Sequence, residues 1–210
     1  AQFDYSSGVS SLSGWNAYTG NNTSNISWMW KRHAGFDVQR YTGQTGQQSR
    51  EHLLNAVPEM LWIKKRNSSD DNVWFDTSRG PQKEIISNST AAEVTKSGDA
   101  IISFDSDGFT TGNNGAINAN GDTYVAWCWK ANGQGSSDTN GSINSIYTSA
   151  NTTAGFSLVS YTGTGSNATV GHGLGVAPKV VFIKRTSATS QWVFGHKDLG
   201  FTKFLELNLT

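Results

Sequence analysis

Two histidines are the residues of this sequence best placed to contact a ligand. His52 stands in "REHLLNAVP" and His172 in "VGHGLGVAP", so similar residues follow both. A repeated imidazole could contact a ligand or bind a metal ion. The alternative is a loop histidine that bonds backbone groups at the entrance of a strand. We prefer this second interpretation, because no His-x-His or HExxH spacing supports zinc.

One turn carries oxygen atoms of the kind that calcium prefers. Asp105 and Asp107 lie in "FDSDGF", close to several asparagines. Carboxylate and amide oxygens suit calcium, but an EF-hand loop would need a third ligand ahead of its glycine. Aspartate is also common in tight turns that bind no metal ion, because its side chain can hydrogen-bond to the nearby backbone. The two aspartates are therefore weak calcium candidates, and we expect neither a metal ion nor another cofactor.

The acidic residues do not form a recognisable catalytic pair. Glycoside hydrolysis needs two acids that face each other across a groove. Glu51, Glu59, Glu84 and Glu93 have no acidic counterparts in the repeat described below. The sequence also lacks a GxSxG elbow, a Walker loop and a kinase signature. The lone Cys128 lies in the alternating stretch "TYVAWCWK", which favours a buried, inert thiol, so we do not expect an enzyme.

Aromatic residues are the remaining candidates for binding. Trp15 and Tyr18 lie in the turn-rich "SLSGWNAYTG" and are the best candidates for exposure to sugar rings or to a partner protein. Tryptophans also alternate in residues 26–30 and 124–129, so each pair projects to one face of a strand. A layer of the core is the preferred interpretation of these pairs, and an exposed platform is the alternative.

The elements that would position these residues are repeated. Ala34 and the residues after it align with Ala154 and the residues after it, without a gap to the last residue. Identical positions include the two histidines, and many of the others are conservative. A weaker sequence similarity relates the residues that follow Phe3 to those that follow Phe104. Such self-similarity predicts a duplicated structural unit.

The repeat divides the chain into four parts. We expect residues 1–33 to be the end of a preceding repeat, 34–133 a complete repeat, 134–153 a linker, and 154–210 the beginning of another copy. The linker is rich in Gly, Ser, Asn and Thr, which predicts a mobile segment or one pinned on a surface. The chain starts with Ala1, so we expect a processed chain or a piece of a longer one. Residues 1–33 and 154–210 could complete one another, or unseen sequence or a neighbouring chain could supply the missing parts.

Short, evenly spaced strands are expected within the complete repeat. The candidates, which are separated by turn-forming residues, are 36–41, 60–64, 73–76, 84–87, 100–104 and 124–130. Six such strands without a convincing amphipathic helix indicate an all-β fold made of tandem antiparallel β-sandwich repeats.

Composition limits the partners of this protein. The 210 residues include 16 basic and 16 acidic residues, so no net field draws the chain to nucleic acid or to a membrane surface. The chain also contains eight tryptophans, and 11% of its residues are aromatic. Disordered chains avoid such residues, so we expect a folded chain with neither nucleic acid nor membrane as a partner.

The motifs "AGFSLVSYTGTG", "VGHGLGVAPKVVFIKR" and "GDTYVAWCWKANG" resemble repeats in tail-fibre and other virion proteins of marine tailed bacteriophages, including cyanophages. The resemblance covers most of the chain except the linker. It implies a jelly-roll sandwich of the concanavalin A type and a non-enzymatic structural role in the virion, outside the cell. It further implies a homo-oligomer that contacts other tail proteins and a glycan of the host surface. The alternatives are a lectin-like adhesin module of a bacterial surface protein and a hydrolase of surface polysaccharide.

Overall fold

The computed structural model describes residues 29–32 and 35–209. The chain falls into a unit of residues 1–30 and a unit of residues 31–210, and every strand and helix below belongs to the second. Trp15 and Tyr18 lie outside the described residues, so their exposure stays a prediction.

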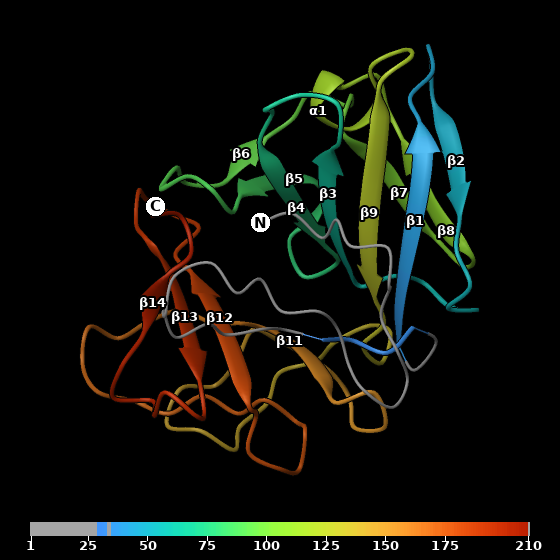
Figure 1. Ribbon diagram of the computed structural model, residues 1–210. Coiled ribbons are helices and arrows are strands. Elements are labelled where there is room, and N and C mark those ends of the chain that lie inside the picture. Colours follow the sequence, from blue (N-terminus) through green and yellow to red (C-terminus); the bar gives the residue numbers. More distant parts are fainter. Residues whose placement is uncertain (1–28, 33–34, 210) are drawn as a thin grey trace, which may run out of the picture. The chain divides into compact units, whose positions relative to one another are not determined.

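The first half of the second unit contains two antiparallel sheets (Figure 1). The strands of the six-stranded sheet are, in spatial order, β1 (Phe36–Thr42), β9 (Thr123–Trp129), β3 (Met60–Lys65), β4 (Asn72–Asp76), β5 (Gly80–Ile86) and β6 (Val94–Thr95). Those of the three-stranded sheet are β2 (Gln48–Glu51), β8 (Gly108–Thr111) and β7 (Ile101–Asp105).

A hydrophobic core joins these two sheets. Along β3 and β9 the side chains alternate, so that Leu61, Ile63 and Tyr124 are fully buried on one face. Phe109 of β8 and Ile117 belong to the same buried cluster. The burial of such side chains from both sheets is what holds the sheets together.

Ile117 comes from α1 (Gly115–Asn118), a single turn of helix. Asn114 caps this turn, because its side chain accepts a hydrogen bond from the backbone N–H of Ala116. Within the described residues no helix is long and apolar enough to cross a membrane.

The second half of this unit has two smaller antiparallel sheets. One pairs β10 (Tyr147–Asn151) with β11 (Phe156–Ser160), and the other contains β12 (Val180–Lys184), β13 (Trp192–His196) and β14 (Leu205–Glu206).

The strand registers of the two halves repeat as the sequence does. Trp62 pairs with Trp74 between β3 and β4, and the aligned residues Phe182 and Phe194 pair between β12 and β13. The pairing of β4 with β5 recurs, again in the same register, between β13 and β14. Identical pairing at aligned positions shows that β3–β5 and β12–β14 fold alike, while β1 and β11 pair with different strands.

The expected all-β fold with antiparallel sheets is confirmed. The six candidate strands fall on β1, β3, β4, β5, β7 and β9. Their ends differ from the predicted ones by at most one residue, except that β5 begins four residues earlier, at Gly80. Within the same repeat the sequence did not predict β2, β6, β8 or α1. The segment expected to be a linker contains β10, which pairs along its length with β11.

Candidate functional site

The two histidines occupy the same turn in the two halves. The Nδ1 atom of His52 accepts a hydrogen bond from the N–H of Leu54 (3.4 Å), and that of His172 accepts one from Leu174 (3.2 Å). Each imidazole thus bonds the backbone two residues further on, before β3 or β12 begins. His52 is buried and His172 is half-buried. Contact of either histidine with a ligand stays a prediction.

A polar residue of β1 in the first half, and of the aligned β11 in the second, fastens this turn. In the first half, Asp37 of β1 accepts a hydrogen bond from the N–H of Leu53 (2.8 Å). In the second half, the aligned Ser157 donates one to the carbonyl of His172 (2.5 Å). The duplication therefore preserved the link between strand and turn while the side chain that makes it changed.

Asp37 is fully buried and charged. Burial by itself raises the pKa of this carboxyl. The hydrogen bonds that it accepts from Arg32, from the N–H of Leu53 and from Gln39 together outweigh this effect and lower the pKa to about 2. Burial also lowers the pKa of His52, whose Nε2 atom is buried without a hydrogen-bond partner in the described structure. These pKa shifts favour an ionised Asp37 and a neutral His52 near neutral pH.

The two calcium candidates make hydrogen bonds within their own turn and its neighbour. The Oδ2 atom of Asp105 accepts a hydrogen bond from the hydroxyl of Thr110 (2.8 Å). The carbonyl of Asp107 accepts one from the N–H of His52 (2.8 Å). The described residues contain no group of three or more His, Cys, Asp or Glu side chains that could hold a metal ion.

Three of the four glutamates have structural partners. Glu59 accepts hydrogen bonds from the N–H groups of Ala131 and Gly133, both at 2.6 Å, and so fixes the chain that leaves β9. Glu84 forms an ion pair with Lys96. Glu93 pairs with Arg79 and Lys83 at the β4–β5 turn.

The tryptophans of β9 lie on the face opposite the main core, while Cys128 between them is fully buried. Trp129 is buried against Phe36, with ring centroids 5.0 Å apart. Trp127 is half-buried and packs on Trp62 at 5.2 Å. Burial raises the pKa of the Cys128 thiol, which agrees with an inert side chain.

An arginine-lined groove lies on the exposed face of β1 and β9. Its volume is about 380 Å³, and its lining residues are Arg32, Val38, Gln39, Arg40, Tyr41, Thr42, Arg66 and Thr123. The strands bring these residues together, because Thr123 of β9 pairs with Thr42 of β1 and accepts a hydrogen bond from the N–H of Arg66 (2.7 Å). Arg40 is two residues before Thr42, on the same face of β1.

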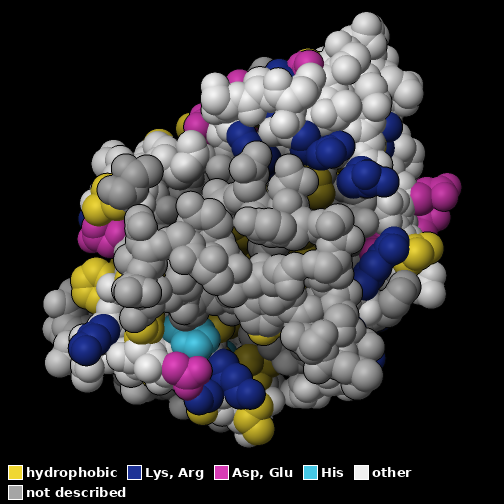
Figure 2. Space-filling model, in the orientation of Figure 1, with side chains coloured by type: hydrophobic (Ala, Val, Ile, Leu, Met, Phe, Trp, Pro, Cys, Tyr) yellow, Lys and Arg dark blue, Asp and Glu magenta, His cyan; other side chains and the backbone are white. Residues whose placement is uncertain are grey.

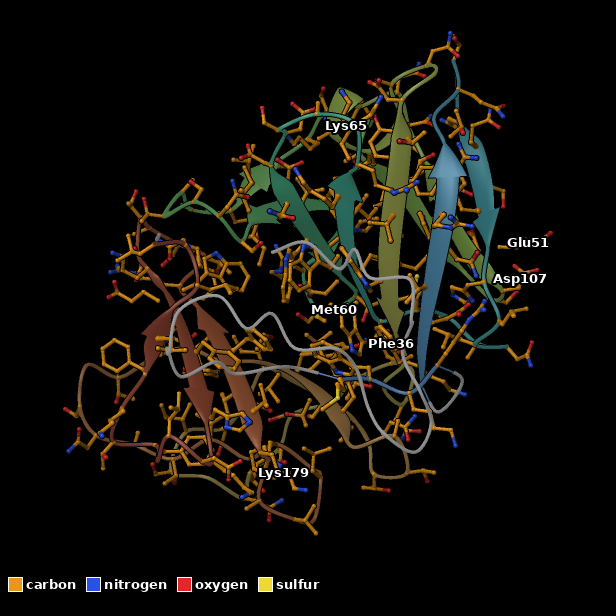
Figure 3. The ribbon with its side chains drawn as sticks, viewed as in Figure 1. Phe36, Glu51, Met60, Lys65, Asp107 and Lys179 are labelled. Atoms are coloured by element: carbon orange, nitrogen blue, oxygen red, sulfur yellow. The ribbon has the colours of Figure 1, made fainter. Side chains whose placement is uncertain are left out.

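Arg40 also lines a second groove, of about 310 Å³, at the edge where β1 faces β2. The other side chains of this groove include Arg50, whose guanidinium lies 4.5 Å from the centre of the Tyr41 ring, and the exposed Glu51. Figure 2 shows Lys and Arg side chains gathered on the molecular surface in the region of β9 and β1. Figure 3 shows Glu51 and Asp107 near one another at the outer side of the β2–β8 pair.

The charges of the first groove are not neutralised from within the described part of the chain. Arg32 bonds to Asp37, but no ion pair joins Arg40 or Arg66 to an acidic side chain there. Both residues are exposed. A guanidinium presents a planar fork of N–H donors that matches carboxylate, sulfate or phosphate. The groove can therefore bind an anionic group.

Sequence reasoning missed this groove because the net charge of the chain is zero. The signal that could have found it was the position of Arg40 in β1. Arg40 lies with Val38 on one face of this strand, and Asp37 and Tyr41 lie on the other face. That Arg66 would lie beside the same end of β1 depended on the insertion of β9 between β1 and β3, which no local pattern indicates.

The comparisons with known proteins identify the chain by family alone. No curated protein and no solved structure is significantly similar to it. One family model matches residues 33–210, a range that spans the first half, the connecting segment and the second half. The chain belongs to the family described as "Domain of unknown function (DUF7483)".

Proposed function

We propose that this chain is a non-catalytic binding module that attaches to acidic surface polysaccharide through the groove around Arg40. The setting that we propose is a tail fibre or another appendage of a phage virion, where the module contacts the bacterial surface. The supporting observation is that Arg40 and Arg66 line one groove without an acidic partner in the described structure.

The fold is compatible with this role. Strands β1–β9 form antiparallel sheets with a shared core, as the strands of lectin-like sandwiches do. We therefore propose a jelly-roll sandwich of the concanavalin A type for the first half. Such folds carry sugar-binding sites without catalytic groups. The resemblance of the repeated motifs to tail-fibre proteins supports the virion setting.

The groove selects for charge more than for apolar surface. Its lining is dominated by arginine, threonine and glutamine side chains, with Val38 and Tyr41 as the apolar contributors. A uronic acid, a sulfated sugar or a phosphorylated sugar would place its anionic group between the guanidinium groups. Weak binding by one groove would suit a repetitive surface polymer, since several modules acting together multiply the affinity.

A lectin-like adhesin of a bacterial surface is the second candidate. The observation that favours it is that one compact unit, residues 31–210, contains every lining residue of the groove. The virion setting predicts assembly into larger species, whereas an adhesin module would bind as a monomer.

The proposal is tested by measuring binding of the purified chain to acidic and neutral polysaccharides. We expect binding to the acidic polymers that weakens as the salt concentration rises, because exposed charges are screened. Arg40→Ala should weaken it about tenfold, the loss of one charge-assisted contact worth about 1.4 kcal/mol. Arg185→Ala is the matched control, since Arg185 is exposed and does not line either groove. Equal binding by both variants, or equal binding to neutral polymers, would refute the proposal.

A further inference from the structure

An open strand edge runs between the two grooves that contain Arg40. Strand β1 lies at the end of the six-stranded sheet, where β9 is its only partner among the described strands. Three consecutive residues of β1, namely Gln39, Arg40 and Tyr41, line both grooves. Successive side chains of a strand point to opposite faces, so grooves that share all three residues meet at the edge of the strand. The backbone of β1 is therefore part of the lining of both grooves.

The hydrogen bonds of β1 show which of its backbone groups face this edge. The N–H of Lys130 donates to the carbonyl of Gly35, and that of Gly43 donates to the carbonyl of Asp122, both over 2.8 Å. In an antiparallel pair each residue directs its N–H and its C=O to the same side, and the side alternates along the strand. The odd-numbered residues of β1 thus bond β9, and the even-numbered residues present their backbone groups to the open edge.

Arg40 differs from the even-numbered residues on either side of it. The carbonyl of Thr42 accepts a hydrogen bond from the guanidinium of Arg50 (3.3 Å). The N–H of Val38 donates to the carboxylate of Asp37 and helps to lower its pKa. The N–H and the C=O of Arg40 both lack a hydrogen-bond partner among the described residues. One donor and one acceptor thus point from the same residue to the same side of the strand.

The charges around this edge differ between its two sides. In the second groove, Arg50 already donates to the Oδ1 atom of Asn118 (3.0 Å), and the exposed Glu51 adds a negative charge. In the first groove, Arg40 and Arg66 have no acidic partner in the described structure, and no described lining residue is acidic. An acidic sugar would therefore place its carboxylate in the first groove and an uncharged part of its ring against the edge.

From this arrangement we infer that the site selects hexuronic acids whose neighbouring ring hydroxyl groups are unsubstituted. The carboxylate binds the guanidinium groups of Arg40 and Arg66 in the first groove. One hydroxyl donates a hydrogen bond to the carbonyl of Arg40, and its neighbour accepts one from the N–H of the same residue, because a hydroxyl can do either. This inference rests on the proposed function and names the class of acidic polymer that the site prefers.

The number of free backbone groups favours a sugar ring over an added peptide strand. A strand that pairs with β1 would need free N–H and C=O groups at successive even-numbered residues. Val38 and Thr42 each have one of these groups occupied, so only Arg40 between them offers both. A pair of hydroxyl groups matches one donor and one acceptor. A sugar whose hydroxyls carry sulfate or acetyl groups has lost the donor that the carbonyl of Arg40 requires.

Chemical removal of the neighbouring hydroxyl groups tests this inference on the polymer. Alginate is a hexuronic acid polymer that carries such hydroxyl pairs. Periodate cleaves the carbon–carbon bond between the two hydroxyls, and borohydride then reduces the resulting aldehydes to alcohols, while the carboxylates remain. We expect the purified full-length chain to bind the treated alginate about tenfold more weakly than untreated alginate of matched length, at the same salt concentration.

Two variants of Arg40 separate the backbone contact from the charge. Arg40→Ala and Arg40→Pro both remove the guanidinium, but only the proline variant also removes the N–H. An edge strand accepts proline where the N–H faces outwards, as it does here. We expect Arg40→Ala to bind both polymers more weakly and to keep the preference for untreated alginate. Arg40→Pro should lose most of this preference, and urea unfolding checks that both variants are folded.

The outcomes distinguish this inference from the proposed function. Equal binding of treated and untreated alginate would overturn the inference and leave the binding of acidic polymers intact. Failure to bind any acidic polymer would overturn both. If Arg40→Pro does not fold, hydrogen exchange of the unmodified chain replaces it: the amide of Arg40 should exchange about tenfold more slowly when alginate is bound. An unchanged exchange rate at Arg40 in the complex would also overturn the inference.

Discussion

Trp192 donates a hydrogen bond from its indole Nε1 atom to the backbone carbonyl of Ile86, over 2.8 Å. Ile86 ends β5 in the first half, and Trp192 begins β13 in the second. Trp192 is 2% exposed and packs against Trp74 with ring centroids 5.0 Å apart. The two halves are thus joined by a buried contact that combines apolar packing with one directed hydrogen bond.

Replacement of this indole should destabilise the protein. Trp192→Phe removes the donor, leaves the carbonyl of Ile86 without its partner, and opens a small cavity, so we expect the free energy of unfolding to fall by about 2 kcal/mol. Urea unfolding followed by circular dichroism measures this change. Trp62→Phe is the matched control, because the indole N–H of Trp62 is buried without a partner in the described structure and its loss should cost less. A larger effect at Trp62 would contradict the importance of the hydrogen bond.

Two asparagines provide a second test, this time of the equivalence of the halves. The Oδ1 atom of Asn88 accepts a hydrogen bond from the N–H of Asn72 (2.8 Å), and that of Asn208 accepts one from Trp192 (2.7 Å). We expect Asn88→Ala and Asn208→Ala each to lower the free energy of unfolding by about 1 kcal/mol. Asn208→Asp retains an acceptor and should cost less than Asn208→Ala in the same urea experiment. Full stability of either alanine variant would show that the aligned contact has no structural role.

The repeat made much of this fold predictable. An ungapped alignment requires aligned residues to occupy equivalent places, and the pairs Trp62–Trp74 and Phe182–Phe194 satisfy that requirement. Strands with several large apolar residues, such as β3 and β9, were found because one of their faces is buried. The strands that the sequence did not predict are short, with at most one large aromatic side chain each: β2 reads "QSRE", β6 reads "VT" and β8 reads "GFTT". Their strand conformation comes from pairing with neighbouring strands, which is a tertiary effect that a local pattern does not reveal.

The candidate site was harder to predict than the fold. The two histidines were candidate ligand contacts because both copies of the repeat contain them. In the structure their Nδ1 atoms accept hydrogen bonds from the backbone N–H groups of Leu54 and Leu174. The groove around Arg40 depends instead on strand order, since β9 joins β1 and β3 although it follows them by many residues in the chain. Long-range pairing of this kind decides which charged side chains become neighbours.

Asp37 should make the protein sensitive to acid. Its pKa in the folded state, about 2, is below the usual value of 3.8, so its ionised form stabilises the fold above pH 4, and this contribution is lost as the pH falls towards 2. Asp37→Asn should therefore lower the free energy of unfolding by about 2 kcal/mol near pH 6 and by much less near pH 2. Unfolding in urea at several pH values measures the difference. A constant difference between the two proteins at all pH values would argue against a charged Asp37.

His52 should also make the stability of the protein depend on pH, but at a pH closer to neutral than Asp37 does. Burial lowers its pKa in the folded state below the ordinary value of 6.5, so the unfolded chain binds a proton more readily than the folded one as the pH falls below 6.5. Stability should decrease between pH 6.5 and pH 5 for this reason. His52→Asn keeps an acceptor near the N–H of Leu54 but cannot be protonated, so its stability should depend less on pH in this range. Urea unfolding at pH 5, 6 and 7 compares the two proteins, and equal slopes would show that His52 is protonated as easily in the folded chain as in the unfolded one.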